Sequence, residues 1–141
     1  MEESARYRAF ISYSHRDARW GRWIHRQLES YRLPSAIVGR ATPFGPVPDR
    51  LQPIFRDRDE LGTATDLSTE IQTALRRSLF LVVVCSPAAA ASRWVDHEIR
   101  FFKRLHGEDR VRAIIVGGEP FSEDPAQECF PEALRFRTGA D

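Results

Sequence analysis

The sequence is poor in cysteine and has no large excess of charge of either sign. Among its 141 residues, the spacing of Cys85 and Cys129 fits neither a disulfide framework nor a metal-binding motif, so we expect two free thiols in a reducing cytosol. The 21 basic and 20 acidic side chains give a formal charge of +1, and no basic block alternates with aromatic residues. We therefore expect no nucleic acid partner.

Long hydrophobic runs are also absent. The longest, LFLVVVC at residues 79–85, is far too short to cross a bilayer, and MEESARYR at the amino terminus lacks the apolar core of a secretion signal. We therefore expect a cytoplasmic protein with no membrane partner. The length suits a single domain, 1–141, that can bury a core without disulfide or metal staples.

Two nucleotide-binding signatures are missing. The sequence contains neither GxGxxG nor GxxxxGK followed by Ser or Thr, which excludes a dinucleotide fingerprint and a P-loop. We expect no tightly bound nucleotide cofactor of either class.

The sequence does contain an alternation of strand and helix patterns. Strands are predicted at 9–13, 51–55, 79–85 and 111–118. Pro53 suggests that the second strand either lies at an edge or begins late. Two helices are predicted after the caps Asp17 and Asp66, and a third is predicted over residues 92–105 from its apolar spacing. The repeated order predicts an α/β fold with a parallel sheet and helices on both faces. The first helix has apolar positions at helical spacing, which we expect to face the sheet: Trp20, Trp23, Ile24, Leu28 and Tyr31.

One acidic residue lies on the apolar side of a predicted helix. In SRWVDHEIRFFKRL, residues 92–105, Glu98 falls inside the band of residues that faces the core. A carboxylate there costs several kcal/mol unless it is paired, hydrogen-bonded or open to a cleft. It could face the edge of the sheet at the carboxyl ends of the strands, where such folds bind their ligands. It could also lean outward to pair with Arg93 or Arg104, and the residues alone leave both interpretations open.

A charged loop, RDRDELGTAT at residues 56–65, follows the second predicted strand. Asp57, Asp59 and Glu60 could supply oxygen ligands to a hard cation. Arg56 and Arg58 alternate with them and favour ion pairs instead, so we expect no metal site.

Three segments together resemble a known family. FISYSHRD, FRDRDELGTATDL and LFLVVVCSPAAAASRWVDHEI occur in the order and spacing of a bacterial Toll/interleukin-1 receptor (TIR) domain, and the likeness covers about residues 7–118. The resemblance implies a flavodoxin-like fold. It also implies the NAD-cleaving activity of many members, with NAD+ as a substrate and no cofactor.

The same resemblance nominates site residues. The catalytic glutamate of the family follows a tryptophan by four residues, which selects Glu98 and the substrate-pocket residue Trp94. Residues that end the first strand and begin its loop are expected to contact the nucleotide, although relatives often carry Arg where Ser14 or His15 stands. The loop after the second strand is expected to flank the nucleotide and to pack on a neighbouring protomer. The substrate-binding candidates are Tyr13, Ser14, His15, Asp57, Glu60 and Trp94, and the assembly-loop candidates are Arg58, Glu60, Leu61 and Gly62.

The function that this resemblance implies is NAD+ hydrolysis to nicotinamide and ADP-ribose or a cyclic variant, activated by self-association in bacterial defence or signalling. This role requires Glu98 to be ionised and reachable from the strand-end crevice. The alternative is a non-catalytic module that acts through TIR–TIR contacts. A phosphoacceptor receiver domain using Asp57 would share the fold, but the acidic pair expected after its first strand is missing.

The segment 119–141 lacks an obvious fifth strand and final helix, which family members usually have. We expect it to be an incomplete end of the domain or the start of a linker. In that case a carboxyl-terminal sensor or repeat module would complete the protein.

Overall fold

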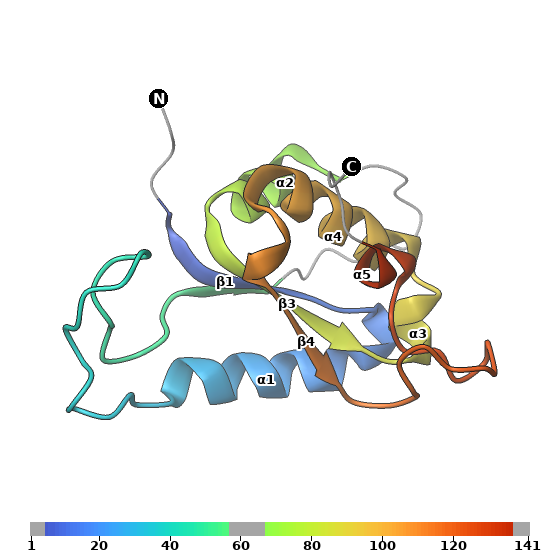
Figure 1. Ribbon diagram of the computed structural model, residues 1–141, viewed down its shortest axis with the longest axis horizontal. Helices are drawn as coiled ribbons and strands as arrows, with labels where there is room; N and C mark the ends of the chain where they lie inside the picture. The colour runs from blue at the N-terminus through green and yellow to red at the C-terminus, as the bar shows by residue number, and fades with distance from the viewer. Residues whose placement is uncertain (1–4, 57–66, 137–141) are drawn as a thin grey trace.

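The computed structural model describes residues 5–56 and 67–136, which form a parallel sheet flanked by helices (Figure 1). The strands lie in the order β2-β1-β3-β4, and all neighbouring pairs are parallel. This order confirms the predicted α/β arrangement. Both interpretations of Pro53 are confirmed, because β2 lies at the edge of the described sheet and begins only at Ile54. The strands are β1 (Tyr7–Ser12), β2 (Ile54–Arg56), β3 (Ser78–Cys85) and β4 (Val111–Ile115).

Helices cover both faces of the sheet, as the alternating pattern predicts. In Figure 1, α1 lies below the sheet, while α2, α4 and α5 lie above it. No helix within the described ranges is long and apolar enough to span a membrane. The helices are α1 (Ala18–Ser30), α2 (Thr69–Arg76), α3 (Pro87–Ala90), α4 (Arg93–His106) and α5 (Glu132–Arg135), with single 3-10 turns η1 (His15–Asp17) and η2 (Glu108–Arg110).

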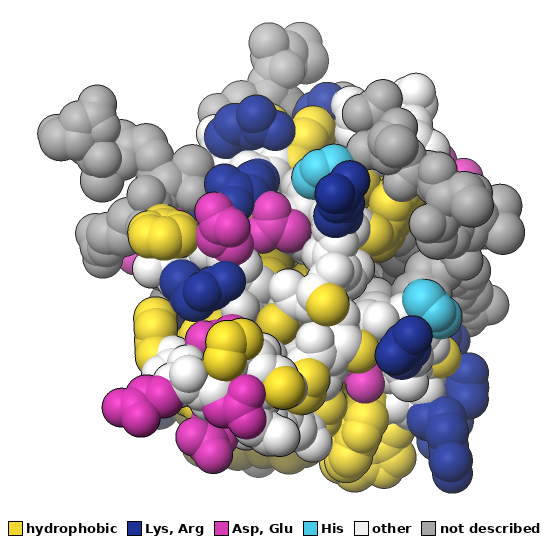
Figure 2. All heavy atoms as spheres, turned by 90° about the vertical axis from the view of Figure 1, so that its right-hand side faces the viewer, with side chains coloured by type: hydrophobic (Ala, Val, Ile, Leu, Met, Phe, Trp, Pro, Cys, Tyr) yellow, Lys and Arg dark blue, Asp and Glu magenta, His cyan; other side chains and the backbone are white. Residues whose placement is uncertain are grey.

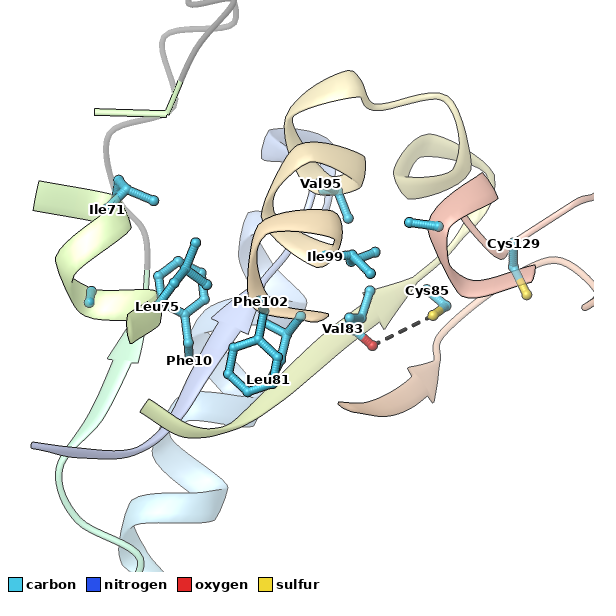
Figure 3. Packing of buried hydrophobic residues seen from close by; sticks show 12 residues of the cluster. Phe10, Ile71, Leu75, Leu81, Val83, Cys85, Val95, Ile99, Phe102 and Cys129 are labelled. Atoms are coloured by element: carbon cyan, nitrogen blue, oxygen red, sulfur yellow. Dashed lines mark hydrogen bonds between the residues drawn. The ribbon is translucent and has the colours of Figure 1, made fainter. Parts of the chain in front are cut away.

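The larger core lies between the sheet and the helices α2 and α4 (Figure 3). Phe10, Leu81 and Val83 project from the strands against Ile99 and Phe102 of α4, and none of these side chains has exposed surface. Burying a side chain of this size stabilises the fold by about 1.5–3 kcal/mol. This cluster therefore fixes the position of α4, which carries Glu98.

Both cysteines are free thiols, as expected, and both belong to this core. Cys129 has no exposed surface, although its neighbours in the sequence are polar. Burial raises the pKa of the Cys85 thiol to about 12, and the nearby Cys129 adds to the rise. Cys85 therefore stays protonated at neutral pH.

The orientation of α1 differs from the prediction. Gly21 and Ile24 face the sheet, whereas the side chains of Trp20, Trp23 and Tyr31 are exposed. The reason is the close approach at Gly21, where a Cβ atom would lie 3.1 Å from the ring of Tyr13. Because the smallest residue of the helix meets the sheet, the two tryptophans are left outside the contact.

Two helix starts follow from capping serines. The side chain of Ser92 accepts a hydrogen bond from the N–H of Val95 and caps the start of α4. The cap of α2 is Ser68, which accepts from the N–H of Ile71, so the prediction of Asp66 as the cap is wrong. Serine and aspartate are both good helix caps, and this helix begins after the serine.

The described part of the tail packs on the rest of the domain. The N–H of Ala133 in α5 donates to Asp96 of α4 at 2.8 Å, and Lys103 Nζ donates to the carbonyl of Phe136 at 3.0 Å. A single parallel bridge joins Glu119 to Glu128. Segment 119–136 thus contributes contacts and a buried cysteine to the core.

A glycine substitution tests how tightly this tail is packed. Gly118 has a φ of +79°, and a Cβ atom there would lie 2.5 Å from the carbonyl oxygen of Gln127. We expect Gly118→Ala to lower the free energy of unfolding by about 1–3 kcal/mol, measured by chemical denaturation. Gly117→Ala is the matched control, because its φ is ordinary and its nearest contact would be 3.9 Å from Pro87. Equal stability of the two variants would contradict this packing.

Candidate functional site

Glu98 lies on the buried face of α4 and reaches the end of the first strand. Its side chain has no exposed surface, and Oε1 accepts a hydrogen bond of 2.6 Å from the hydroxyl of Ser12. This contact helps to offset the cost of placing a carboxylate on the apolar side of the helix. The alternative, in which Glu98 leans outward to Arg93 or Arg104, is wrong, because the carboxylate points into the molecule.

The hydrogen bond places the carboxylate at a specific point of the sheet. Ser12 is the last residue of β1, and it lies opposite Val83 of the neighbouring strand β3. From β1 the chain moves to β2 on one side of the sheet, and it later enters β3 on the other side. Ligands of open α/β sheets bind in the crevice at this switch point, outside the carboxyl ends of the strands. Glu98 therefore places an acidic group at the predicted ligand edge.

A second contact joins the loops that follow the same two strands. The hydroxyl of Ser86, directly after β3, donates a hydrogen bond of 2.5 Å to the carboxylate of Asp17, which precedes α1. Ser86 also accepts from the N–H of Ala89 and begins α3. Asp17 makes no side-chain capping bond to its own helix, because its carboxylate is used across the loops. This hydrogen bond thus joins the loop after β1 to the loop after β3, next to the start of α1.

The predicted nucleotide-contacting residues are only in part accessible. Tyr13 and Ser14 are buried, and Ser14 Oγ accepts a hydrogen bond of 3.3 Å from the N–H of Arg16 as the cap of η1. His15 is exposed. Trp94 is half-buried and packs against the larger core, which fits both a core residue and a pocket wall.

The remaining predicted positions belong to one segment. The substrate candidates Asp57 and Glu60 and the assembly candidates Arg58, Leu61 and Gly62 lie outside the described residues. Their roles stay predictions.

One expectation about Glu98 is not met in this conformation. The proposed chemistry requires the carboxylate to be reachable from the crevice, whereas the structure leaves it no exposed surface. A substrate ribose could reach Oε1 only after the atoms that cover it move.

Three polar residues of this region were not named as site residues by the sequence analysis, which treated Asp17 only as a helix cap. Ser12, Asp17 and Ser86 each lie within a few residues of a predicted strand end. Their position there was a usable signal, because polar side chains at strand ends line the ligand edge. Their partners could not be predicted, since Ser12 and Glu98 are 86 positions apart in the sequence and Asp17 and Ser86 are 69 apart.

Comparison with known families decides the relationship that the three segments suggest. The family model described as TIR domain matches residues 9–137. The chain belongs to the TIR domain family. The match extends beyond residue 118 and includes most of the tail that packs on α4.

This TIR domain is also similar to a curated protein in sequence and to a solved structure in fold. Over 119 residues it is 36% identical to a protein named NAD(+) hydrolase ApTIR from Actinoplanes sp. (strain ATCC 31044 / CBS 674.73 / SE50/110), a match that covers 81% of this chain. The chain spans 14% of the length of that relative. The TIR domains in the structure of the activated Roq1 resistosome directly recognizing the pathogen effector XopQ match it with a TM-score of 0.50 and 22% identity, covering 78% of this chain and 56% of that one. This likeness shows the shared fold.

Proposed function

We propose that this TIR domain cleaves the bond between nicotinamide and ribose in NAD+, giving nicotinamide and ADP-ribose or a cyclic variant. The observation that carries the proposal is the carboxylate of Glu98, held by Ser12 at the switch point of the sheet. A protein that is 36% identical is named as an NAD(+) hydrolase, which supports the same substrate. NAD+ is the substrate in this proposal, and no cofactor takes part.

The chemistry asks little of the protein beyond charge stabilisation. In NAD+ the nicotinamide ring is a positively charged pyridinium. It takes the bonding electrons and departs as a neutral molecule, so the leaving group needs no general acid. The ribose develops oxocarbenium character, as the sugar does in glycoside hydrolysis. An ionised Glu98 beside the ribose would accept hydrogen bonds from its hydroxyls and stabilise the developing positive charge. Water then attacks the ribose carbon, loses a proton and gives ADP-ribose. Attack by a nucleophile of the same ADP-ribosyl group gives the cyclic variant instead.

We further propose that self-association activates the enzyme. A carboxylate with no exposed surface in a single chain cannot contact a ribose. Contacts between chains that rearrange the end of β1 would expose it and would make activity depend on concentration. The segment that holds Arg58, Glu60, Leu61 and Gly62 is one candidate for such contacts, and bacterial defence or signalling in the cytoplasm is the proposed setting.

The other proposed substrate contacts come from the loop after β1, the segment after β2 and the start of α4. His15 is the exposed candidate after β1, and Trp94 lies one helical turn before Glu98 on α4. Asp57 and Glu60 are proposed to flank the nucleotide on the strength of the family resemblance. Tyr13 and Ser14 are buried, so their proposed role is to shape the loop that carries His15.

The burial of Glu98 also favours a second candidate function. A non-catalytic module that works through TIR–TIR contacts needs no reachable carboxylate. Incubating concentrated protein with NAD+ and following nicotinamide by chromatography distinguishes the two functions. Release that rises more steeply than protein concentration supports the enzyme, whereas release at the rate of protein-free buffer supports the module.

A conservative change tests the role of Ser12 as a positioning residue. Ser12→Ala removes the hydroxyl that donates to Glu98 Oε1. Because a hydrogen bond to a charged group contributes about 1.5–3 kcal/mol, we expect kcat to fall on the order of 10- to 100-fold. KM should change little, since the carboxylate acts on the transition state. A rise in KM with unchanged kcat would indicate instead that Ser12 serves substrate binding.

A further inference from the structure

The outward face of α1 carries an aromatic pair that the fold leaves exposed. The side chains of Trp20 and Trp23 are 45% and 48% exposed, and their rings meet edge to face with centroids 5.9 Å apart. They line an open groove of about 830 Å³ together with Asp17 and the arginines Arg16, Arg19, Arg22 and Arg26. We call this surface the Trp20–Trp23 groove. Exposed tryptophans that contact one another mark a surface suited to docking.

The groove is strongly basic, although the whole chain is nearly neutral. Its four arginines are all exposed, and within the described part of the chain none of their guanidinium groups pairs with a carboxylate. Arginine and tryptophan are enriched at the centres of protein interfaces, where arginine pairs with carboxylates and tryptophan fills pockets. The groove therefore fits a partner that offers an apolar side chain surrounded by acidic groups.

The tail of the same chain offers such an element. Phe121 is 65% exposed and has a φ of +54°, which is unusual for a bulky residue. Glu119, Glu123 and Asp124 around it are exposed. We call residues 119–124 the Phe121 tip. On the side of the molecule seen in Figure 2, acidic side chains gather at the lower left, and hydrophobic side chains flanked by basic ones lie at the lower right.

The tip is held in shape before any partner binds. Glu128 Oε2 accepts hydrogen bonds of 3.0 Å from the N–H groups of Phe121 and Phe130, and Oε1 accepts one of 3.2 Å from the N–H of Ser122. The hydrogen bond from Phe130, with those from Phe121 and Ser122, lowers the pKa of the Glu128 carboxyl, which favours its ionised form. The rings of Phe121 and Phe130 also meet edge to face at 5.6 Å. An unusual backbone angle that is locally supported points to a functional element.

We propose that the Phe121 tip of one copy of this chain docks in the Trp20–Trp23 groove of a second copy. Phe121 inserts beside the two tryptophans, and Glu119, Glu123 and Asp124 face the arginines that line the groove. Because the two surfaces differ, each chain can bind one neighbour through its groove and another through its tip, so the contact extends into a row or a ring. This proposal rests on the self-association in the proposed function and specifies a contact through which it occurs. The contact itself does not require NAD cleavage.

The position of the groove gives the contact a route to the candidate site. Arg16 and Asp17 lie directly after Ser14 and His15, and Asp17 holds Ser86 at the end of β3. A neighbour that contacts this end of the groove would therefore act on the two loops at the switch point.

The test measures solution mass by light scattering and sedimentation over a range of protein concentrations. The wild-type mass should rise above the 16.2 kDa of one chain as concentration increases. Trp23→Ser and Phe121→Ser should each weaken association at least about tenfold, because aromatic anchors dominate such contacts. Tyr31→Ser, an exposed aromatic at the end of α1 that does not line the groove, should associate as the wild type does.

Mixing experiments identify the partner surface. A mixture of Trp23→Ser and Phe121→Ser retains one intact groove and one intact tip, so it should form pairs that do not grow further. Charge reversal gives a second mixing test. One protein carries Arg19→Glu and Arg22→Glu in the groove, and the other carries Glu123→Arg and Asp124→Arg in the tip. Each should stay monomeric, because its groove and tip have charge of the same sign, and the two should associate when mixed. A loss of association in Trp23→Ser but not in Phe121→Ser would overturn the proposal by showing that another element fills the groove. A monomeric wild type at all concentrations would overturn it as well.

Failure of this contact is distinguishable from failure of the proposed activity. Glu98→Gln should associate as the wild type does, because Glu98 is buried away from both surfaces. If the protein releases nicotinamide but does not associate through these surfaces, the proposed activity stands and the proposed contact is wrong.

Discussion

Glu98→Gln should abolish most nicotinamide release by concentrated protein. Glutamine keeps the shape of the side chain and an oxygen that can accept from Ser12, but it carries no negative charge. If the carboxylate stabilises the cationic ribose, its loss should lower kcat by at least about 100-fold, the magnitude typical of a preorganised electrostatic group. Chromatographic quantification of nicotinamide and ADP-ribose at matched protein concentrations measures this effect.

The fold should survive this substitution. Glu98 has no exposed surface, and a buried neutral amide costs less to desolvate than a buried carboxylate. Thermal unfolding of Glu98→Gln should therefore give a Tm at or above that of the wild type. Glu70→Gln, an exposed change in the first turn of α2, is the matched control and should keep wild-type activity. Equal release by Glu98→Gln and wild type would assign Glu98 a structural role and favour the non-catalytic module.

Much of the fold could be predicted because periodicity is a local property. The apolar run 79–85 predicts a buried strand, and β3 covers Ser78–Cys85. The apolar spacing over residues 92–105 predicts a helix, and α4 covers Arg93–His106. Glu98 stood out because one acidic residue interrupts an apolar band, and its carboxylate accepts a hydrogen bond from Ser12 at the end of β1, beside β3.

The failures arise where tertiary contacts outweigh the local pattern. The helical spacing of Trp20 and Trp23 suggested a buried stripe on α1, but Gly21 allows the helix to approach Tyr13 and turns both tryptophans outward. Cys129 lies among polar residues in the sequence, yet it is part of the core because the tail folds back on α4. A single sequence contains no signal for either contact.

The burial of Glu98 connects the proposed activity with the proposed contact. If both proposals hold, a carboxylate that is sealed in the single chain makes the domain inactive until its two complementary surfaces associate. If so, the charge-reversed proteins should each release little nicotinamide and should regain activity when mixed. This recovery would follow association rather than total protein concentration.

Lys103→Met should strongly destabilise the attachment of the tail. The side chain of Lys103 is only 3% exposed, and its ammonium group pairs with Glu108 at 2.8 Å and donates to the carbonyls of Ala133 and Phe136. These partners use all the donors that an ammonium group has. Methionine fills a similar volume but donates nothing, so the carbonyls lose this donor and Glu108 loses its buried cation. We expect the free energy of unfolding to fall by about 3 kcal/mol, measured by urea denaturation.

The neighbouring residue provides the control for this change. Arg104 is exposed on the same turn of α4, and Arg104→Met should change stability by no more than about 0.5 kcal/mol. Hydrogen exchange locates the effect, because the amide of Ala133, which donates to Asp96, should lose protection in Lys103→Met before the strands do. A Lys103→Met protein as stable as the Arg104→Met control would mean that Asp96 and the buried Cys129 hold the tail without the lysine. Since the Phe121 tip belongs to this tail, a loosened tail should also weaken self-association, whereas the strand-end position of Glu98 depends on core contacts that Lys103 does not make.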